Sequence, residues 1–273
     1  MTSIDLPDAT PSTVFSPRMI VRVLERRDGP PLDLANVLPV AQRWREALLS
    51  LSNDKSAEAR RQISGHEADG TPLTEPHLAL APFASVDHPH ADGQLLAMAV
   101  VLPRELSPDL RRELIQIVGR VEELKLGRLG AWWLAEESSN PVGWALDPER
   151  LTGEPAGTTH WATLTPVVFD RHPKASDPAE VRREVSEMIA ATCPTIGLPR
   201  PREVLPSPVS THLGVPPAHA FPRLRRKDSS EPRHTHAILI FDHAVRGPML
   251  LGAGRYRGYG VCSPMLSGEE ISG

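Results

Sequence analysis

A segment near the C-terminus combines backbone freedom with positive charge. The sequence GAGRYRGYG of residues 252–260 contains four glycines, Gly252, Gly254, Gly258 and Gly260. Glycine lacks a Cβ, so the backbone can approach a phosphate closely while Arg255 and Arg257 donate hydrogen bonds to it. Tyr256 and Tyr259 add aromatic faces on which RNA bases stack. The segment therefore indicates RNA binding or, as the alternative, a glycine-rich turn with solvated arginines.

Paired histidines suggest a different chemistry, metal-dependent hydrolysis. Two HxH pairs occur in the chain, His88–His90, which Asp87 and Asp92 flank, and His234–His236. Such side chains can ligate a divalent metal that activates water. The HxH spacing alone is a weak signal, and no barrel-like alternation of strands and helices surrounds the pairs. We keep a metal hydrolase as an alternative and assign no metal or other cofactor.

Composition sets limits on the class of protein. The 273 residues carry a formal net charge of −4, which argues against indiscriminate nucleic-acid binding but allows a local basic surface. No apolar run approaches the roughly 18 residues of a membrane span, and the N-terminus lacks a signal-like pattern, so we expect a soluble, cytoplasmic protein. Cys193 and Cys262 lack CxxC partners and predict buried small residues rather than a disulfide framework.

The first half of the chain predicts a β-α-β-β-α-β unit. Residues 1–17 are polar with three prolines and predict a flexible lead. Apolar residues at helical spacing predict a helix over 34–51, and Ser107 followed by Pro108 begins a second helix that reaches about Val121. Strands are predicted over residues 19–25, 77–86, 94–102 and 130–135. This order is that of the ferredoxin-like motif.

The second half largely repeats this order. Asp177 and Pro178 begin a helix that reaches about Ala191, and the next expected helix is replaced by RGPMLL and the glycine-rich segment. Strands are predicted over residues 161–169, 202–209 and 237–241, with a short possible strand at 259–265. We therefore predict an α+β fold of tandem ferredoxin-like (RRM-like) domains, over residues 18–150 and 151–273, with a C-terminal glycine-rich loop.

Five separated stretches resemble one family of CRISPR proteins. They are SGHEADGTPLTEPHLALAPF (64–83), HPHADGQLLAMAVVLPREL (88–106), WATLTPVVFDRHPK (161–174), HTHAILIFD (234–242) and RGPMLLGAGRYRGYG (246–260). Together they resemble the RAMP superfamily, in particular the Cas-six repeat-processing endoribonucleases and the C-terminal part of the type I-G (I-U) Cas-five/Cas-six fusion. The chain has no room for the Cas-five part, so we expect a split gene product or an excised C-terminal half. Its GxG pairs are three residues apart, where the family has about five.

The resemblance implies a nuclease that cuts CRISPR precursor RNA within each repeat without a metal. The 2′-OH of the RNA attacks the adjacent phosphorus, which leaves a 2′,3′-cyclic phosphate and a 5′-OH. The reaction needs a base, an acid and cations around the phosphate. The implied partners are the repeat RNA and other type I-G effector subunits, with no membrane.

The resemblance also points to candidate residues. His66 lies in a polar segment after the first predicted helix, where relatives often carry the catalytic histidine, and His77 is the second candidate proton carrier; which is acid and which is base stays open. Glu67 and Asp69 are candidates to orient an imidazole. A further RNA-binding set comprises Arg225, Arg226, Lys227, His234 and His236, in addition to the glycine-rich segment. For each histidine, the alternative is an ordinary surface or strand-edge side chain.

A non-enzymatic alternative shares all the RNA-binding features. RAMP proteins also serve as structural subunits that hold a processed guide RNA without cutting it. Only a working histidine separates the two functions, so the sequence leaves both open.

Overall fold

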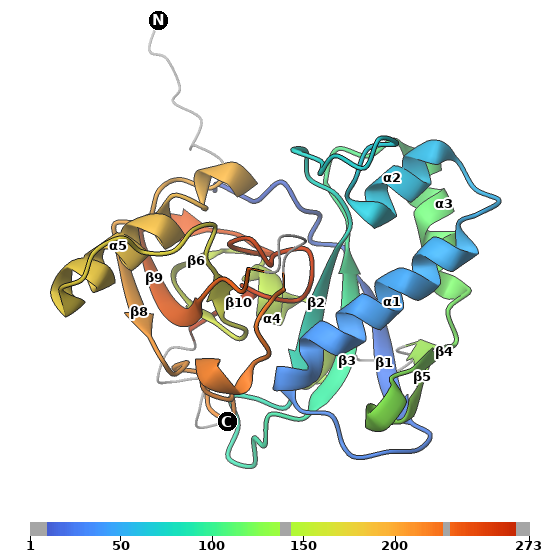
Figure 1. Cartoon of the computed structure of the whole chain (residues 1–273), viewed down its shortest axis with the longest axis horizontal. Helices are drawn as coiled ribbons and strands as arrows, with labels where there is room; N and C mark the ends of the chain where they lie inside the picture. The colour runs from blue at the N-terminus through green and yellow to red at the C-terminus, as the bar shows by residue number, and fades with distance from the viewer. Residues whose placement is uncertain (1–9, 137–142, 226–229, 266–273) are drawn as a thin grey trace, which may run out of the picture.

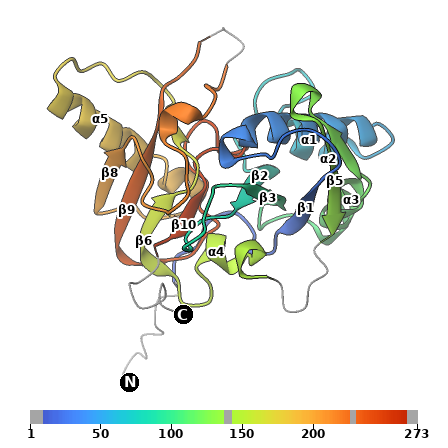
Figure 2. The same cartoon turned by 90° about the horizontal axis from the view of Figure 1, so that it is seen from below.

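The computed structural model describes residues 10–136, 143–225 and 230–265. Two α+β halves lie side by side, each built on an antiparallel sheet (Figure 1). Helices α1 and α2 lie along one face of the first sheet, and α5 lies on the side of the second sheet that faces away from the first half (Figure 2). One continuous hydrophobic core runs through both halves.

The first sheet has the ferredoxin-like strand order. Its elements are β1 (Ile20–Arg26), α1 (Val37–Leu51), α2 (Ala57–Ser64), β2 (Ala79–Ala84), β3 (Leu95–Val101), α3 (Pro108–Gly119), β4 (Glu123–Lys125) and β5 (Ala131–Glu136). The strands are arranged β2-β3-β1-β5-β4, with β4 added at the edge of the four-stranded motif. All described neighbours in this sheet pair antiparallel. The predicted β-α-β-β-α-β unit is therefore confirmed.

The second half repeats the pattern with one helix fewer. Its elements are α4 (Glu149–Thr152), β6 (Thr158–Thr163), β7 (Val167–Val168), α5 (Pro178–Ala190), β8 (Glu203–Ser207), β9 (His234–Val245) and β10 (Cys262–Pro264). The main strands are arranged β8-β9-β6-β10, because β9 pairs with both β6 and β8. The glycine-rich loop, residues 252–260, stands where the second helix is expected. The predicted α+β fold is confirmed.

Local signals in the sequence explain where the helices begin. The Ser107 hydroxyl accepts the Leu110 N–H and the Asp177 carboxylate accepts the Ala179 N–H, as N-caps do. Helix α2 has no counterpart in our sequence prediction. Its sequence AEARRQIS has little apolar periodicity, but Ser56 caps its start and Gly65 ends it in a left-handed conformation. Ser56 and Gly65 were therefore the sequence signals from which α2 could have been predicted.

Residues 10–17, which we expected to be flexible, instead join the two halves. The chain crosses from one half to the other in this segment (Figure 1). Backbone hydrogen bonds run from the Val14 N–H to the Ile196 carbonyl and from the Ser16 N–H to the Leu102 carbonyl. Phe15 is completely buried, and the Thr13 hydroxyl donates to the Pro248 carbonyl. Burial of the Phe15 side chain stabilises the segment in this position, although its sequence is mostly polar.

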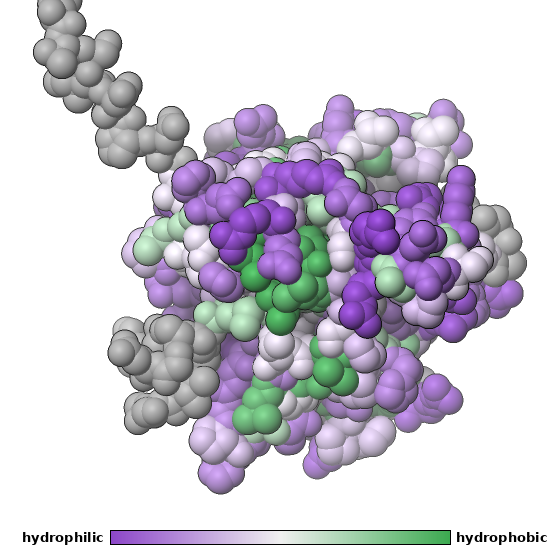
Figure 3. Space-filling view, turned by 90° about the vertical axis from the view of Figure 1, so that its left-hand side faces the viewer, coloured by the Kyte–Doolittle hydropathy of each residue, from purple (hydrophilic) through white to green (hydrophobic). Residues whose placement is uncertain are grey.

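The outward side of the second half carries exposed apolar side chains. The face on which α5 and β8 lie shows an apolar area surrounded by hydrophilic residues (Figure 3). Leu205 in β8 is 42% exposed and Val209, just after it, is 54% exposed. Within the described residues, no helix has the length and apolar character needed to cross a bilayer.

Candidate functional site

An open groove of about 800 Å³ lies where the two halves meet. Its walls bring together six of the residues that the sequence singled out. From the first half they include His66 and His77, and from the second half Arg225, Arg255, Tyr256 and Arg257. Residues about 180 positions apart in the chain therefore face one open space, with two imidazoles opposite several guanidinium groups.

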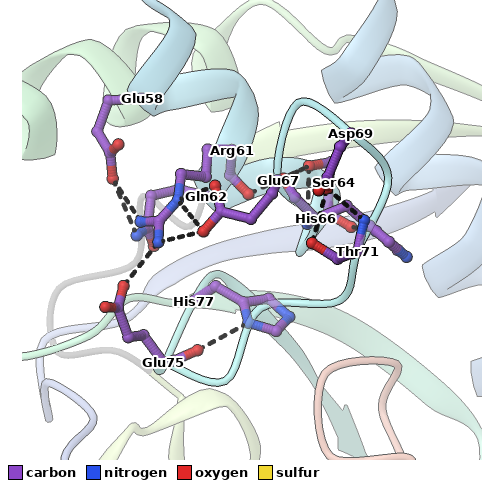
Figure 4. A network of polar contacts seen from close by, with 10 residues as sticks. All are labelled: Glu58, Arg61, Gln62, Ser64, His66, Glu67, Asp69, Thr71, Glu75 and His77. Atoms are coloured by element: carbon purple, nitrogen blue, oxygen red, sulfur yellow. Dashed lines mark hydrogen bonds and ion pairs between the residues drawn. The ribbon is translucent and has the colours of Figure 1, made fainter.

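Arg61 fixes the loop that carries the two histidines (Figure 4). From α2, its guanidinium reaches Glu67 at 2.8 Å, Glu75 at 2.8 Å and Glu58 at 3.2 Å. These contacts hold residues 65–77, the α2–β2 loop, at both ends, and the bonds from Arg61 lower the pKa of Glu67. We expected Glu67 and Asp69 to orient an imidazole, but Glu67 pairs with Arg61 and Asp69 with Thr71. The Ser64 backbone carbonyl orients the His66 imidazole instead.

His66 is oriented with one ring nitrogen available. Its Nδ1 lies 2.9 Å from the Ser64 carbonyl oxygen. A carbonyl only accepts hydrogen bonds, so Nδ1 carries the proton of the neutral ring and the lone pair is on Nε2. No described residue has a hydrogen bond to Nε2, and the side chain is half-buried at the groove. The ring points away from the Arg61 network (Figure 4). This is the arrangement of a general base.

His77 is packed more tightly than His66. Its ring stacks on Tyr256 with a centroid distance of 3.5 Å, and its Nδ1 lies 3.1 Å from the Glu75 carbonyl oxygen. Gly65 is required beneath it, because a Cβ there would lie 2.5 Å from Nε2 of His77. Burial, followed by the nearby positive charges of Arg45 and Arg255, lowers the pKa of His77 to about 4. At neutral pH this imidazole is uncharged and therefore cannot donate a proton as an imidazolium acid.

The glycine-rich loop turns its glycines inward and its arginines outward. Gly252, Gly254 and Gly258 are buried, and a Cβ on Gly254 would lie 2.6 Å from the Cβ of Tyr259. The guanidinium of Arg255 lies 4.8 Å from the centre of the Tyr256 ring and donates to the Gly252 carbonyl. Burial lowers the pKa of Arg257. The glycines thus permit tight packing of the loop against the protein, which presents the arginine side chains to the groove.

Tyr259 does not offer the open stacking face that we expected. The side chain is completely buried. Its hydroxyl donates to the Pro222 carbonyl, and its ring packs edge-on against Phe221. In a strand, alternate side chains point to opposite faces, so the sequence indicates which ones are buried. This loop is a series of turns, so no such pattern predicts the burial of Tyr259. Of the two tyrosines, only Tyr256 faces the groove.

His236 is also placed differently from the expectation that it faces RNA. It is completely buried; its Nε2 lies 3.1 Å from the Pro216 carbonyl and its Nδ1 2.9 Å from the Thr163 hydroxyl. The carbonyl requires a proton on Nε2, so Thr163 donates to Nδ1 while accepting the Ala237 N–H. Burial lowers the pKa of His236 to about 4. This closed network is structural.

His234 begins β9 and is half-buried. Its Nε2 lies 2.8 Å from the Ala218 carbonyl, and its ring centroid lies 5.9 Å from that of Tyr259. Burial lowers the pKa of His234. It supports the base of the glycine-rich loop, and it is not among the residues that line the groove.

Stability will depend on pH through His236. The unfolded imidazole has a pKa near 6.5 and the folded one about 4, so between these values only the unfolded chain binds the proton. Stability is therefore complete above pH 6.5 and falls as the pH drops toward 4, by up to about 3 kcal/mol for this residue. Urea unfolding from pH 7.5 to 4.5 should show a decrease that is about 2 kcal/mol smaller in His236→Gln. His243→Gln, an exposed histidine on the same strand, is the control. Equal pH dependence of His236→Gln and the unmodified protein would contradict the buried neutral state.

The remaining sequence candidates lie elsewhere or outside the described part of the chain. Arg225 is exposed at the groove, whereas Arg226 and Lys227 fall outside the described residues. Asp87 pairs with His212 and Arg150, and the ring nitrogens of His88 face the Ser85 hydroxyl and the His90 N–H. Among the described residues, no three His, Cys, Asp or Glu side chains are grouped to hold a metal ion.

Two residues that contact Tyr256 escaped the sequence analysis. Arg45 in α1 donates to the Tyr256 carbonyl at 2.6 Å, and the ring of Phe15 meets that of Tyr256 edge-on at 6.2 Å. Arg45 was not singled out in the sequence, and Phe15 lies in the segment that we expected to be a flexible lead. No sequence signal links either of them to position 256, because the contacts form only when the two halves assemble.

Comparison with known proteins gives distant structural similarities. No protein-family model matches the chain, and no curated protein matches its sequence. A solved structure described as CRISPR associated protein Cas6 superimposes with a TM-score of 0.46 and 7% identity, over 91% of this chain and 99% of that chain. A Cas6 product complex gives 0.43 and 16%, over 90% and 98%. A Cas6-related protein from Pyrococcus furiosus gives 0.40 and 11%, over 90% and 96%. Similarities at this level assign no activity to the chain.

Proposed function

We propose that the chain is a metal-independent endoribonuclease that cuts CRISPR precursor RNA in the groove between its two halves. The observation that carries the proposal is the groove itself. Its lining combines His66, whose Nδ1 is oriented by a backbone carbonyl, with Arg255 and Arg257. A base beside several cations is what cleavage by the 2′-OH of RNA requires.

In the proposed reaction, His66 accepts the proton of the 2′-OH through Nε2. The 2′-oxygen attacks the adjacent phosphorus, the bond from phosphorus to the 5′-oxygen breaks, and a 2′,3′-cyclic phosphate forms. Arg255 and Arg257 offset the negative charge that accumulates on the phosphoryl oxygens. The 5′-oxygen takes a proton from water, since the groove is open and His77 is uncharged at neutral pH. His77 forms part of the wall under Tyr256 rather than serving as the acid.

The proposal includes a place in a type I-G effector complex. The resemblance of the sequence suggests that the chain stays with its product RNA beside other subunits. The exposed apolar side chains Leu205 and Val209, in β8 and just after it, support a protein partner. The division of the chain near residue 150 into two domains likewise stays part of the proposal.

A non-cutting RNA-binding subunit is the second candidate function. The observation that favours it is the state of His77, which lies buried under Tyr256 with a pKa lowered to about 4. If cleavage requires an imidazolium acid, the groove lacks one in His77, and the arginines would then bind the RNA without its being cut.

Cleavage of the repeat RNA in EDTA tests the proposal. We expect full activity in EDTA, products that end in a 2′,3′-cyclic phosphate and a 5′-OH, and loss of cutting when the nucleotide before the scissile phosphate is 2′-deoxy. The 2′-deoxy RNA should still bind, because the arginines contact phosphates. Activity that disappears in EDTA and returns with zinc or manganese would favour the metal hydrolase. Tight binding with no cutting in either condition would favour the structural subunit.

A further inference from the structure

Arg45 connects three segments that are far apart in the sequence. Its Nη1 donates to the Ile63 carbonyl at 2.7 Å, and its Nη2 donates to the carbonyls of Leu78 at 3.1 Å and Tyr256 at 2.6 Å. These carbonyls belong to the end of α2, the residue just before β2 and the glycine-rich loop. In Figure 1 that loop, drawn in red, lies beside β2.

Each carbonyl that Arg45 holds lies next to a groove residue. Ile63 precedes the turn that carries His66, Leu78 directly follows His77, and Tyr256 itself stacks on His77. One guanidinium therefore bridges the two ends of the α2–β2 loop, which carries both histidines, and the glycine-rich loop. A planar fork with several fixed N–H donors can serve three carbonyls at once, whereas the single ammonium nitrogen of lysine cannot reproduce that geometry.

The contacts commit three of the five N–H donors of Arg45 to backbone carbonyls. Both of its terminal nitrogens are engaged by protein carbonyls. Burial, together with the positive charge of Arg257, lowers the pKa of Arg45 to about 10, so the side chain remains charged at neutral pH. It lies at the back of the groove as a fixed cation behind Tyr256.

We propose that Arg45 is a positioning residue that holds Tyr256 on His77. It thereby sets the spacing between the α2–β2 loop and the arginines of the glycine-rich loop. Its role in the reaction rests on the proposed endoribonuclease function. The hydrogen bonds to Ile63 and Leu78 fix one side of this spacing and the bond to Tyr256 fixes the other. Removing the fork should therefore release Tyr256 while leaving His66, Arg255 and Arg257, the groups proposed to act on the RNA, unaltered.

The position of Tyr256 can be tested without RNA, because the chain contains only two tyrosines. Labelling with 3-fluorotyrosine gives one ¹⁹F resonance for Tyr256 and one for the buried Tyr259. In Arg45→Gln we expect the Tyr256 resonance to move toward the value of a solvent-exposed tyrosine while the Tyr259 resonance stays in place. Arg43→Gln, which changes an exposed arginine on the same helix that pairs with Glu46, should leave both unchanged.

Arg45→Lys separates charge from geometry and replaces Arg45→Gln if the latter does not fold. It keeps the positive charge but loses the fork, so we expect the Tyr256 resonance to move here as well. An unchanged Tyr256 resonance in a folded Arg45→Lys or Arg45→Gln protein overturns the proposal. Equal movement of both tyrosine resonances also overturns it, because that would indicate a general loss of packing.

The consequence for the reaction is measured separately on repeat RNA. In Arg45→Gln we expect kcat to fall by roughly tenfold or more with KM little changed, because a displaced catalytic group lowers the rate more than the affinity. An unchanged kcat alongside a displaced Tyr256 would overturn the role in catalysis. If the unmodified protein does not cut RNA at all, the proposed function fails, whereas the ¹⁹F spectra still decide whether Arg45 holds Tyr256.

Discussion

Replacing His66 with alanine should lower the rate of RNA cleavage by about 10²-fold or more, the usual scale for loss of a general base. The reason is the orientation of the ring: its Nδ1 faces the Ser64 carbonyl, which leaves the lone pair on Nε2 of a side chain that lines the groove. The arginines that we propose to contact phosphate are unchanged, so RNA affinity should change little. Single-turnover cleavage and a binding titration on the same RNA give the two quantities.

His243→Ala is the matched control for this prediction. His243 is an exposed histidine on β9 that does not line the groove, so its removal should leave the rate unchanged. Normal cutting by His66→Ala would remove His66 from the mechanism without removing the RNA-binding groove. Loss of RNA binding together with cutting would show instead that the α2–β2 loop needs His66 for its shape.

The ferredoxin-like fold was predictable because its signals are local. Caps at Ser107 and Asp177 and apolar strand-length runs fix the element order, and the order restricts the possible sheets. Helix α2 was missed because a short helix with few apolar residues is stabilised mainly by its caps and by tertiary packing. Residues 10–17 were missed for a related reason: their polar composition conceals Phe15, whose burial between the two halves holds the segment in place.

The candidate site was predictable in part of its membership but not in its contacts. His66, His77, Arg255 and Tyr256 do meet in one groove. The stacking of His77 on Tyr256 depends on the packing of the two halves, which no spacing in the sequence encodes. Burial likewise separates residues that look equivalent in the sequence.

Tyr256 and Tyr259 illustrate this separation. Both are tyrosines of the same glycine-rich loop, yet Tyr256 lines the groove while Tyr259 is completely buried. Because the loop consists of turns, the direction of each side chain depends on backbone angles that the sequence pattern leaves open. The glycines follow the same logic, since their missing Cβ atoms serve close packing with the protein rather than an exposed RNA surface.

The double variant Arg255→Ala with Arg257→Ala should weaken binding of the repeat RNA and reduce its dependence on salt. Both side chains line the groove, and an arginine that neutralises a phosphate releases about 0.7 counterion on single-stranded RNA. Loss of two such contacts should lower the slope of log affinity against log salt by about 1.4. Binding titrations at several salt concentrations between roughly 50 and 200 mM measure the slope directly.

A charge-matched control separates local contacts from the overall charge of the protein. Arg43→Ala with Arg112→Ala removes the same two charges from exposed helix positions, where Arg43 pairs with Glu46 and Arg112 with Asp109. We expect this control to keep the salt slope of the unmodified protein, because neither arginine lines the groove. Equal slopes for the control and the groove variant would mean that the arginines act only through net charge. Parallel lines with unchanged affinity in the groove variant would make the glycine-rich loop a structural turn, and the RNA would then have to bind on another surface.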